Sequence, residues 1–238
     1  MTIDPPEAPL RLNKFIAAQL AIGRRQADML IEQGRVLVNG ALPILGARID
    51  PQHDRVTANG QALHGDAAQH FVYVLLDKPV GYVCSRRQQG DSPTIYALLP
   101  KQYQHLKPVG RLDKDSSGLL LLTNDGDSAH RFMHPSFGKR KQYEVTLDKP
   151  LQPLHHQFIN DHGVQLADGP SKLQLERLHD GDGTTWLVTM HEGRNRQIRR
   201  TFTALGYTVT KLHRTSFGAL QLAELAGTRY KEISKPQI

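Results

Sequence analysis

Four consecutive leucines at residues 119–122 lie between a polar loop and the turn-forming residues 124–126. An apolar run of this length, bounded by turn signals, is typical of a strand that is buried on both faces. In the loop before it, Arg111 stands two residues from Asp113, so a cation and a carboxylate project from the same side of an extended chain. The sequence therefore predicts a charged loop at the start of a rigid core strand, which is a suitable place for a reactive group.

Three interpretations of this loop compete. An Arg-x-Asp step in an exposed loop is commonly an ordinary surface ion pair. The loop also fits the first half of an EF-hand, but Asn124 stands at the twelfth position, where a calcium site needs a bidentate glutamate. We therefore exclude calcium. The third interpretation is a catalytic aspartate, Asp113, that a nearby arginine keeps ionised.

The overall charge points to an anionic partner. The 238 residues carry a formal net charge of +7, which favours nucleic acid before a membrane surface. The sequence has no run of eighteen apolar residues and no signal-peptide pattern at residues 1–7, and its single cysteine, Cys84, suits a reducing compartment. We expect a cytoplasmic protein that makes no membrane contact.

The sequence offers little support for metal or cofactor binding. His155, His156 and His162 have no cysteine or carboxylate at ligand spacing, so solvated histidines are expected there. Neither a phosphate-binding glycine-lysine motif nor a dinucleotide fingerprint occurs. We therefore predict no metal site and no cofactor.

Residues 10–60 predict a small domain that begins with two helices. Apolar residues at helical spacing indicate one helix from Leu12 to about Leu20 and a second that ends at Gly34. A strand at residues 36–38 is then expected to turn at Asn39-Gly40. Four basic residues gather around the corner between the helices: Arg11, Lys14, Arg24 and Arg25. They could hold the phosphates of a folded nucleic acid or form an ordinary solvated face, and charge alone leaves both open.

The remaining chain predicts a larger second domain at residues 71–238. Residues 61–70 lack an apolar period and are expected to form a linker. Several later segments alternate apolar and polar residues and are joined by turns, which favours an antiparallel-rich mixed sheet in an α+β fold. These segments lie at residues 141–147, 173–178 and 186–190, and the wholly apolar residues 71–76 are expected to form a further strand.

The densest positive charge lies between Trp186 and Arg214, where six basic residues face a single acid, Glu192. These basic residues are Arg194, Arg196, Arg199, Arg200, Lys211 and Arg214. The apolar residues Ile198 and Phe202 give part of this stretch the pattern of a helix. Arginine rather than lysine favours planar, bidentate contacts to phosphate or carboxylate groups.

Together these motifs resemble the RsuA-like family of ribosomal RNA pseudouridine synthases. The signature is residues 110–113 with Gly118-Leu119 and the turn at 123–126. The other motifs stand in the expected order: Lys78-Pro79-x-Gly81, Lys141-x-Tyr143, residues 192–200 and Leu212-x-Arg214. Residues 10–60 resemble the α-L RNA-binding domain, which is named for a small-subunit ribosomal protein. The resemblance covers the chain from about residue 10 to about residue 234.

The resemblance implies that this chain converts one uridine of ribosomal RNA to pseudouridine without a metal or cofactor. It implies that Asp113 is the catalytic aspartate, which either attacks C1′ or removes a sugar proton, and that Arg199 pairs with it. Tyr143 would stack on the base. Four further arginines of the motifs would hold RNA: Arg111, Arg196, Arg200 and Arg214. The basic residues of the N-terminal domain would also hold RNA: Arg11, Lys14, Arg24 and Arg25.

The target within ribosomal RNA follows less directly. Residues 195–200 with Lys211-Leu212 favour 23S rRNA as the target. The domain order without a long basic tail equally suits an enzyme that modifies 16S rRNA. We expect a monomer that acts on ribosomal RNA or on a ribosomal subunit assembly intermediate. The alternative function is a non-catalytic rRNA-binding or ribosome-assembly factor, against which the intact set of Asp113, Tyr143 and Arg199 argues.

Overall fold

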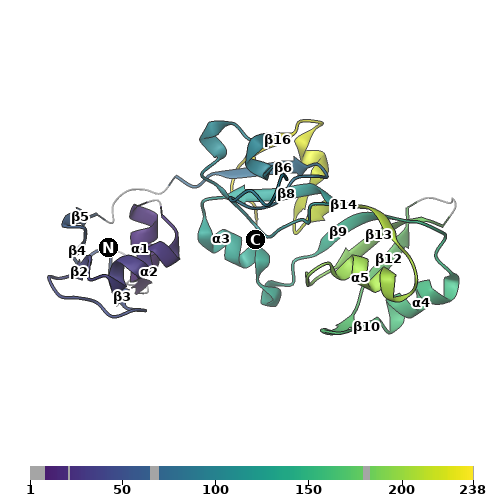
Figure 1. Cartoon of the computed structure of the whole chain (residues 1–238), viewed down its shortest axis with the longest axis horizontal. Helices are drawn as coiled ribbons and strands as arrows, with labels where there is room; N and C mark the ends of the chain where they lie inside the picture. Colours follow the sequence, from purple (N-terminus) through teal and green to yellow (C-terminus); the bar gives the residue numbers. More distant parts are fainter. Residues whose placement is uncertain (1–8, 21, 65–69, 179–182, 238) are drawn as a thin grey trace, which may run out of the picture. The chain divides into compact units, whose positions relative to one another are not determined.

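The computed structural model describes residues 9–20, 22–64, 70–178 and 183–237 (Figure 1). The chain forms two compact units, Met1–His70 and Phe71–Ile238. Residues 65–69 of the predicted linker lie outside the described residues. None of the helices in the described part of the chain is long and apolar enough to cross a lipid bilayer.

The first unit packs two helices on short strands. Its helices are α1 (Leu12–Gln19) and α2 (Arg24–Glu32). Its strands are β1 (Leu10–Arg11), β2 (Val36–Val38), β3 (Arg48–Ile49), β4 (Val56–Ala58) and β5 (Gln61–Leu63). Leu12, Ile16 and Ala27 are wholly buried between the helices and strands. Gly34 ends α2 with a left-handed φ of +67°, as the sequence predicted for a helix-terminating glycine.

The linker prediction is wrong at residues 61–63, which form β5 and pair with β4. Asn59 and Gly60 have φ values of 52° and 78° and make the tight turn between these strands, because this turn type needs two left-handed residues. β5 is an edge strand whose Gln61 and Ala62 are exposed, so it carries no apolar alternation that the sequence could have signalled. The similar turn at Asn39-Gly40 closes only a bridge between Val38 and Ala41.

The second unit is built on one mixed sheet in the order β12-β13-β9-β14-β8-β6-β16. β14 and β8 run parallel, and the other neighbours along this path are antiparallel, which confirms the predicted antiparallel-rich α+β fold. Its strands are β6 (Tyr73–Lys78), β8 (Ser117–Thr123), β9 (Lys141–Leu147), β12 (Gln174–Arg177), β13 (Thr185–Met190), β14 (Val209–Phe217) and β16 (Tyr230–Ile233). Short strands β7 (Lys107–Pro108) and β15 (Leu220–Gln221) extend it, and β10 (Val164–Leu166) and β11 (Gly169–Ser171) form a separate hairpin.

The leucine run forms β8, the buried strand that the sequence predicted. All four leucines are inaccessible to solvent. Leu119 and Leu121 pack into one apolar cluster with Phe132, while Leu120 and Leu122 pack into another with Ile95 on the opposite face. The alternation of a strand sends successive side chains to opposite faces, so both faces of β8 lie in the core.

Within the described residues, three helices and four short 3-10 turns cover this sheet. The helices are α3 (Gly126–Met133), α4 (Pro153–Asp161) and α5 (Gln197–Ala204); the turns are η1 (Ile95–Leu98), η2 (Lys101–Tyr103), η3 (Pro135–Phe137) and η4 (Leu222–Leu225). Figure 1 shows α4 and α5 beside the β12–β13–β9 end of the sheet and α3 beside the β8–β6 end. The Asp125 carboxylate caps α3 by accepting hydrogen bonds from the backbone N–H groups of Asp127 and Ser128.

Helix α4 was not anticipated, and the expectation of solvated histidines on this segment is wrong for two of them. His155 bonds the Tyr207 hydroxyl at 2.8 Å, and the ring of His156 stacks on Trp186 with centroids 4.8 Å apart. Both histidines are half-buried because Pro153 starts a helix that packs on β12. The polar composition of the segment hid this helix, since few of its residues are apolar.

The two halves of the sheet meet at Gly118, opposite Arg214 in the β8–β14 ladder. Gly118 has a φ of +103°, and a Cβ atom there would lie 2.3 Å from the backbone oxygen of Arg214. Only glycine lets the two backbones approach this closely. This contact fixes Arg214 beside the loop that precedes β8.

Replacing Gly118 by alanine tests that contact. We expect Gly118→Ala to lose at least about 3 kcal/mol of unfolding free energy, because backbone rather than a flexible side chain blocks the methyl group. A loss of this size lowers the melting temperature by roughly 6 °C or more, measured by calorimetry. The control is Gly206→Ala, with a φ of +81° and open space around it, which should cost only about 1 kcal/mol. Equal losses in the two variants would contradict the role of close approach.

Candidate active site

The predicted charged loop lines a pocket of about 390 Å³ in the second unit. Its walls bring together five residues that the sequence selected: Arg111, Asp113, Tyr143, Arg196 and Arg214. Lys141 and Arg194 also line the pocket, so five lysine and arginine side chains surround a single carboxylate, that of Asp113. Arg111 lies exposed in the loop. Such a pocket can hold an anionic ligand against one carboxylate.

The loop at residues 110–117 is held at several points by other parts of the unit. Lys78 Nζ donates a hydrogen bond to the backbone oxygen of Ser116 at 2.6 Å. Gly81 donates its N–H to the Lys114 carbonyl at 2.8 Å, and Ser117 Oγ bonds His213 Nδ1 at 2.9 Å. These contacts come from β6, the turn after it and β14. The Asp113 carboxylate is therefore presented by a backbone that neighbouring elements hold in position.

Lys78 is an unusual support because its side chain is completely buried. It donates a second hydrogen bond to the backbone oxygen of Pro79 at 3.0 Å. Burial lowers the pKa of Lys78, and the nearby carboxylates of Asp115 and Asp113 only partly oppose this shift. The Lys-Pro motif is visible in the sequence, but its role in tying β6 to the loop depends on contacts between distant residues.

The arginine partners of the loop differ from the prediction. Arg196 lies with Nη1 3.6 Å from Asp113 Oδ2, and its guanidinium makes two hydrogen bonds, of 2.9 and 3.1 Å, to the Asp115 carboxylate. Arg199 donates to the backbone oxygens of Val209 and Asp115, each at 2.7 Å. Its Nε lies 3.2 Å from Asp115 Oδ2, an ion pair without hydrogen-bond alignment.

The predicted pairing of Arg199 with Asp113 is therefore wrong. Two backbone carbonyls orient the Arg199 guanidinium toward Asp115, which follows Asp113 by two residues in the same loop. The hydrogen bonds from Arg196 lower the pKa of Asp115, against a smaller opposing effect of burial. Asp115 in turn raises the pKa of Arg196, whereas burial lowers the pKa of Arg199. Asp115 thus joins both arginines to the loop, and sequence inspection missed this role.

Tyr143 and Arg214 form the floor of the pocket. They are cross-strand partners on β9 and β14, and only 8% of Tyr143 and 2% of Arg214 are exposed. Arg214 Nε donates to the Leu119 carbonyl at 2.7 Å. Its buried Nη2 has no hydrogen-bond partner within the part of the chain that the structure describes. A buried guanidinium nitrogen that lines a pocket and lacks a hydrogen-bond partner favours an anionic or carbonyl ligand.

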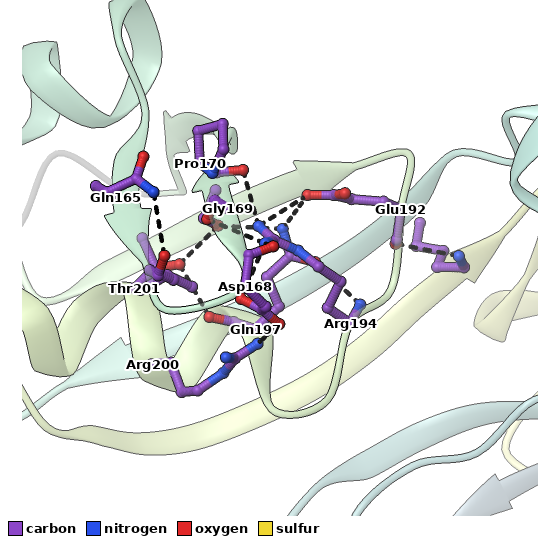
Figure 2. A network of polar contacts seen from close by, with 12 residues as sticks. Gln165, Asp168, Gly169, Pro170, Glu192, Arg194, Gln197, Arg200 and Thr201 are labelled. Carbon is purple, nitrogen blue, oxygen red and sulfur yellow. Dashed lines mark hydrogen bonds and ion pairs between the residues drawn. The ribbon is translucent and has the colours of Figure 1, made fainter.

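A polar network supports the loop that carries Arg196 (Figure 2). Arg194 donates to the backbone oxygens of Asp168, Gly169 and Pro170, at 2.8 to 3.0 Å, in the β10–β11 turn. Arg200 donates to the Asp168 carboxylate at 2.8 Å, so this predicted RNA-binding residue is engaged inside the protein. Arg196 itself has a left-handed φ of 48° at the N-cap of α5, a conformation that needs such support.

Comparison with known proteins agrees with this geometry. A family model described as RNA pseudouridylate synthase matches residues 72–204, more than half of the chain. The chain belongs to the RNA pseudouridylate synthase family. A model of the S4 domain matches residues 10–42, so the chain carries an S4 domain in front, as the resemblance to the α-L module predicted.

Individual relatives match nearly all of this chain. The ribosomal large subunit pseudouridine synthase B of Pseudomonas aeruginosa is 36% identical over 100% of the chain and 63% of its own length. The ribosomal small subunit pseudouridine synthase A of Pasteurella multocida is also 36% identical, over 96% of the chain and 98% of its own length. A crystal structure of a pseudouridylate synthase is 33% identical, with a TM-score of 0.65 over 94% of this chain and 96% of that one. These findings confirm the predicted family.

The basic residues predicted to bind RNA lie in the S4 unit of the chain. Arg11 and Lys14 stand at the start of α1, and Arg24 and Arg25 stand at the start of α2. Asn13 donates a 2.9 Å hydrogen bond to Asp28, which joins the start of α1 to the middle of α2. The four basic residues therefore lie at the N-terminal ends of the two helices.

The buried lysine yields a test based on pH. Because burial makes the pKa of Lys78 lower in the folded than in the unfolded protein, the unfolded chain binds more protons between the two pKa values. The stability contributed by this group therefore rises with pH up to the ordinary lysine value of 10.5. We expect Lys78→Met to lose about 1–3 kcal/mol at neutral pH, since two carbonyls lose their donor. The difference from wild type should grow toward pH 10, measured by urea unfolding.

Lys211→Met is the matched control, because 57% of the Lys211 side chain is exposed and it pairs only with Glu144 at the surface. Its stability relative to wild type should stay constant over the same pH range. A stability difference for Lys78→Met that does not change with pH would show that the buried lysine titrates normally.

Proposed function

We propose that this pseudouridylate synthase isomerises a uridine of ribosomal RNA to pseudouridine, with Asp113 as the catalytic aspartate. The observation that carries the proposal is the pocket in which one carboxylate faces five cationic side chains. RNA is a polyanion, so these cations favour its backbone. Asp113 supplies the only carboxylate that lines the pocket in the described part of the chain.

The reaction needs an ionised carboxylate. It breaks the C1′–N1 bond of uridine and joins C1′ to C5, whose hydrogen leaves as a proton while N1 gains one. Asp113 either attacks C1′ or removes a sugar proton, and both routes require the charged form. The charge of Arg196, 3.6 Å away, faces this carboxylate. Asp115 holds Arg196 in place by two hydrogen bonds.

The target base must leave its stack to reach Asp113. Extruding a base costs a few kcal/mol, and stacking on an aromatic side chain can return about 1–3 kcal/mol of it. Tyr143 provides this platform at the pocket floor. Arg214, whose Nη2 is unpaired, would bind a carbonyl or phosphate of the extruded nucleotide, and the exposed Arg111 would hold a phosphate at the mouth.

We propose ribosomal RNA, or a ribosomal subunit assembly intermediate, as the substrate. The names of the two bacterial relatives refer to the large and the small ribosomal subunit, respectively. Residues 195–200 and Lys211-Leu212 favour 23S rRNA as the target. The basic residues at the starts of the two S4 helices would bind RNA outside the pocket. We propose that the protein acts as a monomer in the cytoplasm.

Replacing Asp113 tests the catalytic role. We expect Asp113→Asn to lower the rate of tritium release from C5-labelled uridine in ribosomal RNA by at least about 10³-fold. RNA binding should persist, because the cations of the pocket remain. Full activity in this variant would overturn the assignment. A wild-type protein that binds ribosomal RNA but releases no tritium would instead support the non-catalytic factor. Chemical mapping of pseudouridines in 16S and 23S rRNA, with and without the gene, identifies the target.

Replacing Asp115 tests whether its carboxylate holds Arg196 and Arg199 in their positions beside the pocket. We expect Asp115→Asn to lower kcat by roughly 10–100-fold, since Arg196 and Arg199 lose their shared anchor and a displacement of about 1 Å is costly in an active site. Stability should change by less than about 1 kcal/mol, because this ion pair is partly exposed. Glu144→Gln removes a surface ion pair with Lys211 and should leave kcat unaltered. A normal kcat in Asp115→Asn would mean that the arginines need no anchor.

A further inference from the structure

Three aromatic rings lie exposed where α3 passes into η3. The centroids of His130 and His134 are 5.0 Å apart, and Phe137 lies 6.4 and 6.2 Å from them with its ring nearly perpendicular to both. All three side chains are exposed, and Phe137 keeps 45% of its surface in solvent. We name this group the rim cluster. It plays no part in the pocket chemistry described above.

The rim cluster lies next to the mouth of the pocket. Met133, on the same helix, lines the pocket, and its sulfur accepts a hydrogen bond from the Gly110 N–H at 3.0 Å. On the other side of the cluster, the Gly138 carbonyl bonds His191 Nδ1 at 3.2 Å. Both contacts belong to the second unit. An RNA strand that enters the pocket therefore passes beside these rings.

The exposure of Phe137 is not a requirement of the core. Helix α3 already buries Phe132, which packs against Phe217 with centroids 5.3 Å apart, and each is only 1% exposed. The core of this half of the sheet is therefore complete without Phe137. An exposed aromatic group next to a binding site is typical of a surface that contacts a partner.

The charge around the rim cluster identifies the chemistry of that partner. From Ser128 through Tyr143 the chain has four lysine and arginine residues and no aspartate or glutamate. Arg131 and Arg140, which are near the rings in sequence, are both exposed. Aromatic rings interleaved with cations are the pattern by which proteins bind single-stranded nucleic acid, through base stacking and phosphate contacts.

We propose that the rim cluster is a second nucleotide-binding subsite, on which an unpaired RNA base next to the target uridine stacks. Arg131 and Arg140 hold the phosphates on either side of that base. The subsite rests on the proposed function, because its ligand is the same RNA strand that enters the pocket. It keeps the neighbouring nucleotide unstacked while the target uridine is extruded.

A fluorescent probe at position 137 tests stacking without reference to catalysis. The chain has one tryptophan, Trp186, which is 1% exposed, so Phe137→Trp adds a solvent-exposed reporter to a constant background. We expect a short single-stranded oligouridylate to quench the new emission, and a duplex RNA of equal length to quench it far less. Phe158→Trp on α4 is the matched control, because Phe158 is 41% exposed at a distance from the pocket lining. Equal quenching at both positions, or none at position 137, would overturn the proposal.

Kinetics on ribosomal RNA provide the second test. We expect Phe137→Ala to raise the RNA concentration needed for half-maximal rate about tenfold, with kcat within about twofold of wild type, because stacking contributes to binding. Phe137→Tyr should restore the wild-type value and Phe158→Ala should match it. If Phe137→Ala behaves like Phe158→Ala, the subsite is wrong while the proposed function stands. If the wild-type protein forms no pseudouridine, the proposed function fails and the fluorescence result alone decides the subsite.

Discussion

The close approach of β8 and β14 at Gly118 is the constraint on which the second unit depends. A side chain at this position would meet the backbone of Arg214 at 2.3 Å, so the parallel pairing of the two strands requires glycine. This pairing joins the half of the sheet that carries β6 and β8 to the half that carries β9 and β14. The loop with Asp113 belongs to the first half, while Tyr143 and Arg214 belong to the second. The pocket exists only because the two halves meet there.

The two aspartates of the loop make different contacts with the neighbouring arginines. Asp115 binds the guanidinium groups of Arg196 and Arg199, and it thereby fixes the N-terminal end of α5 against the loop. Asp113 makes the longer contact of 3.6 Å to Arg196, so its carboxylate has room for a substrate. If Asp113 accepted the two hydrogen bonds from Arg196 instead of Asp115, both oxygens of its carboxylate would already be bound by the protein. In the proposed mechanism, the structural carboxylate of Asp115 leaves the Asp113 carboxylate available for the reaction.

The sequence predicted the parts of this arrangement that depend on local patterns. The leucine run gave a strand buried on both faces, and the helical spacing of Leu12 and Ile16 gave α1. Features that depend on distant contacts were missed. Arg199 was assigned to Asp113, but the carbonyl of Val209, ten residues away, turns its guanidinium to Asp115. Helix α4 and strand β5 escaped prediction because each buries few apolar side chains, so neither shows a clear hydrophobic period.

The hydrogen bond from Gly110 to Met133 gives the rim cluster a physical connection to the catalytic loop. Gly110 begins the loop in a left-handed conformation, with a φ of +74°, and Met133 is the last residue of α3. In the proposed subsite, a base that stacks on His134 and Phe137 would hold the end of α3, and this end contacts the first residue of the loop that presents Asp113. The proposal therefore links RNA outside the pocket to the backbone of this loop through one short contact.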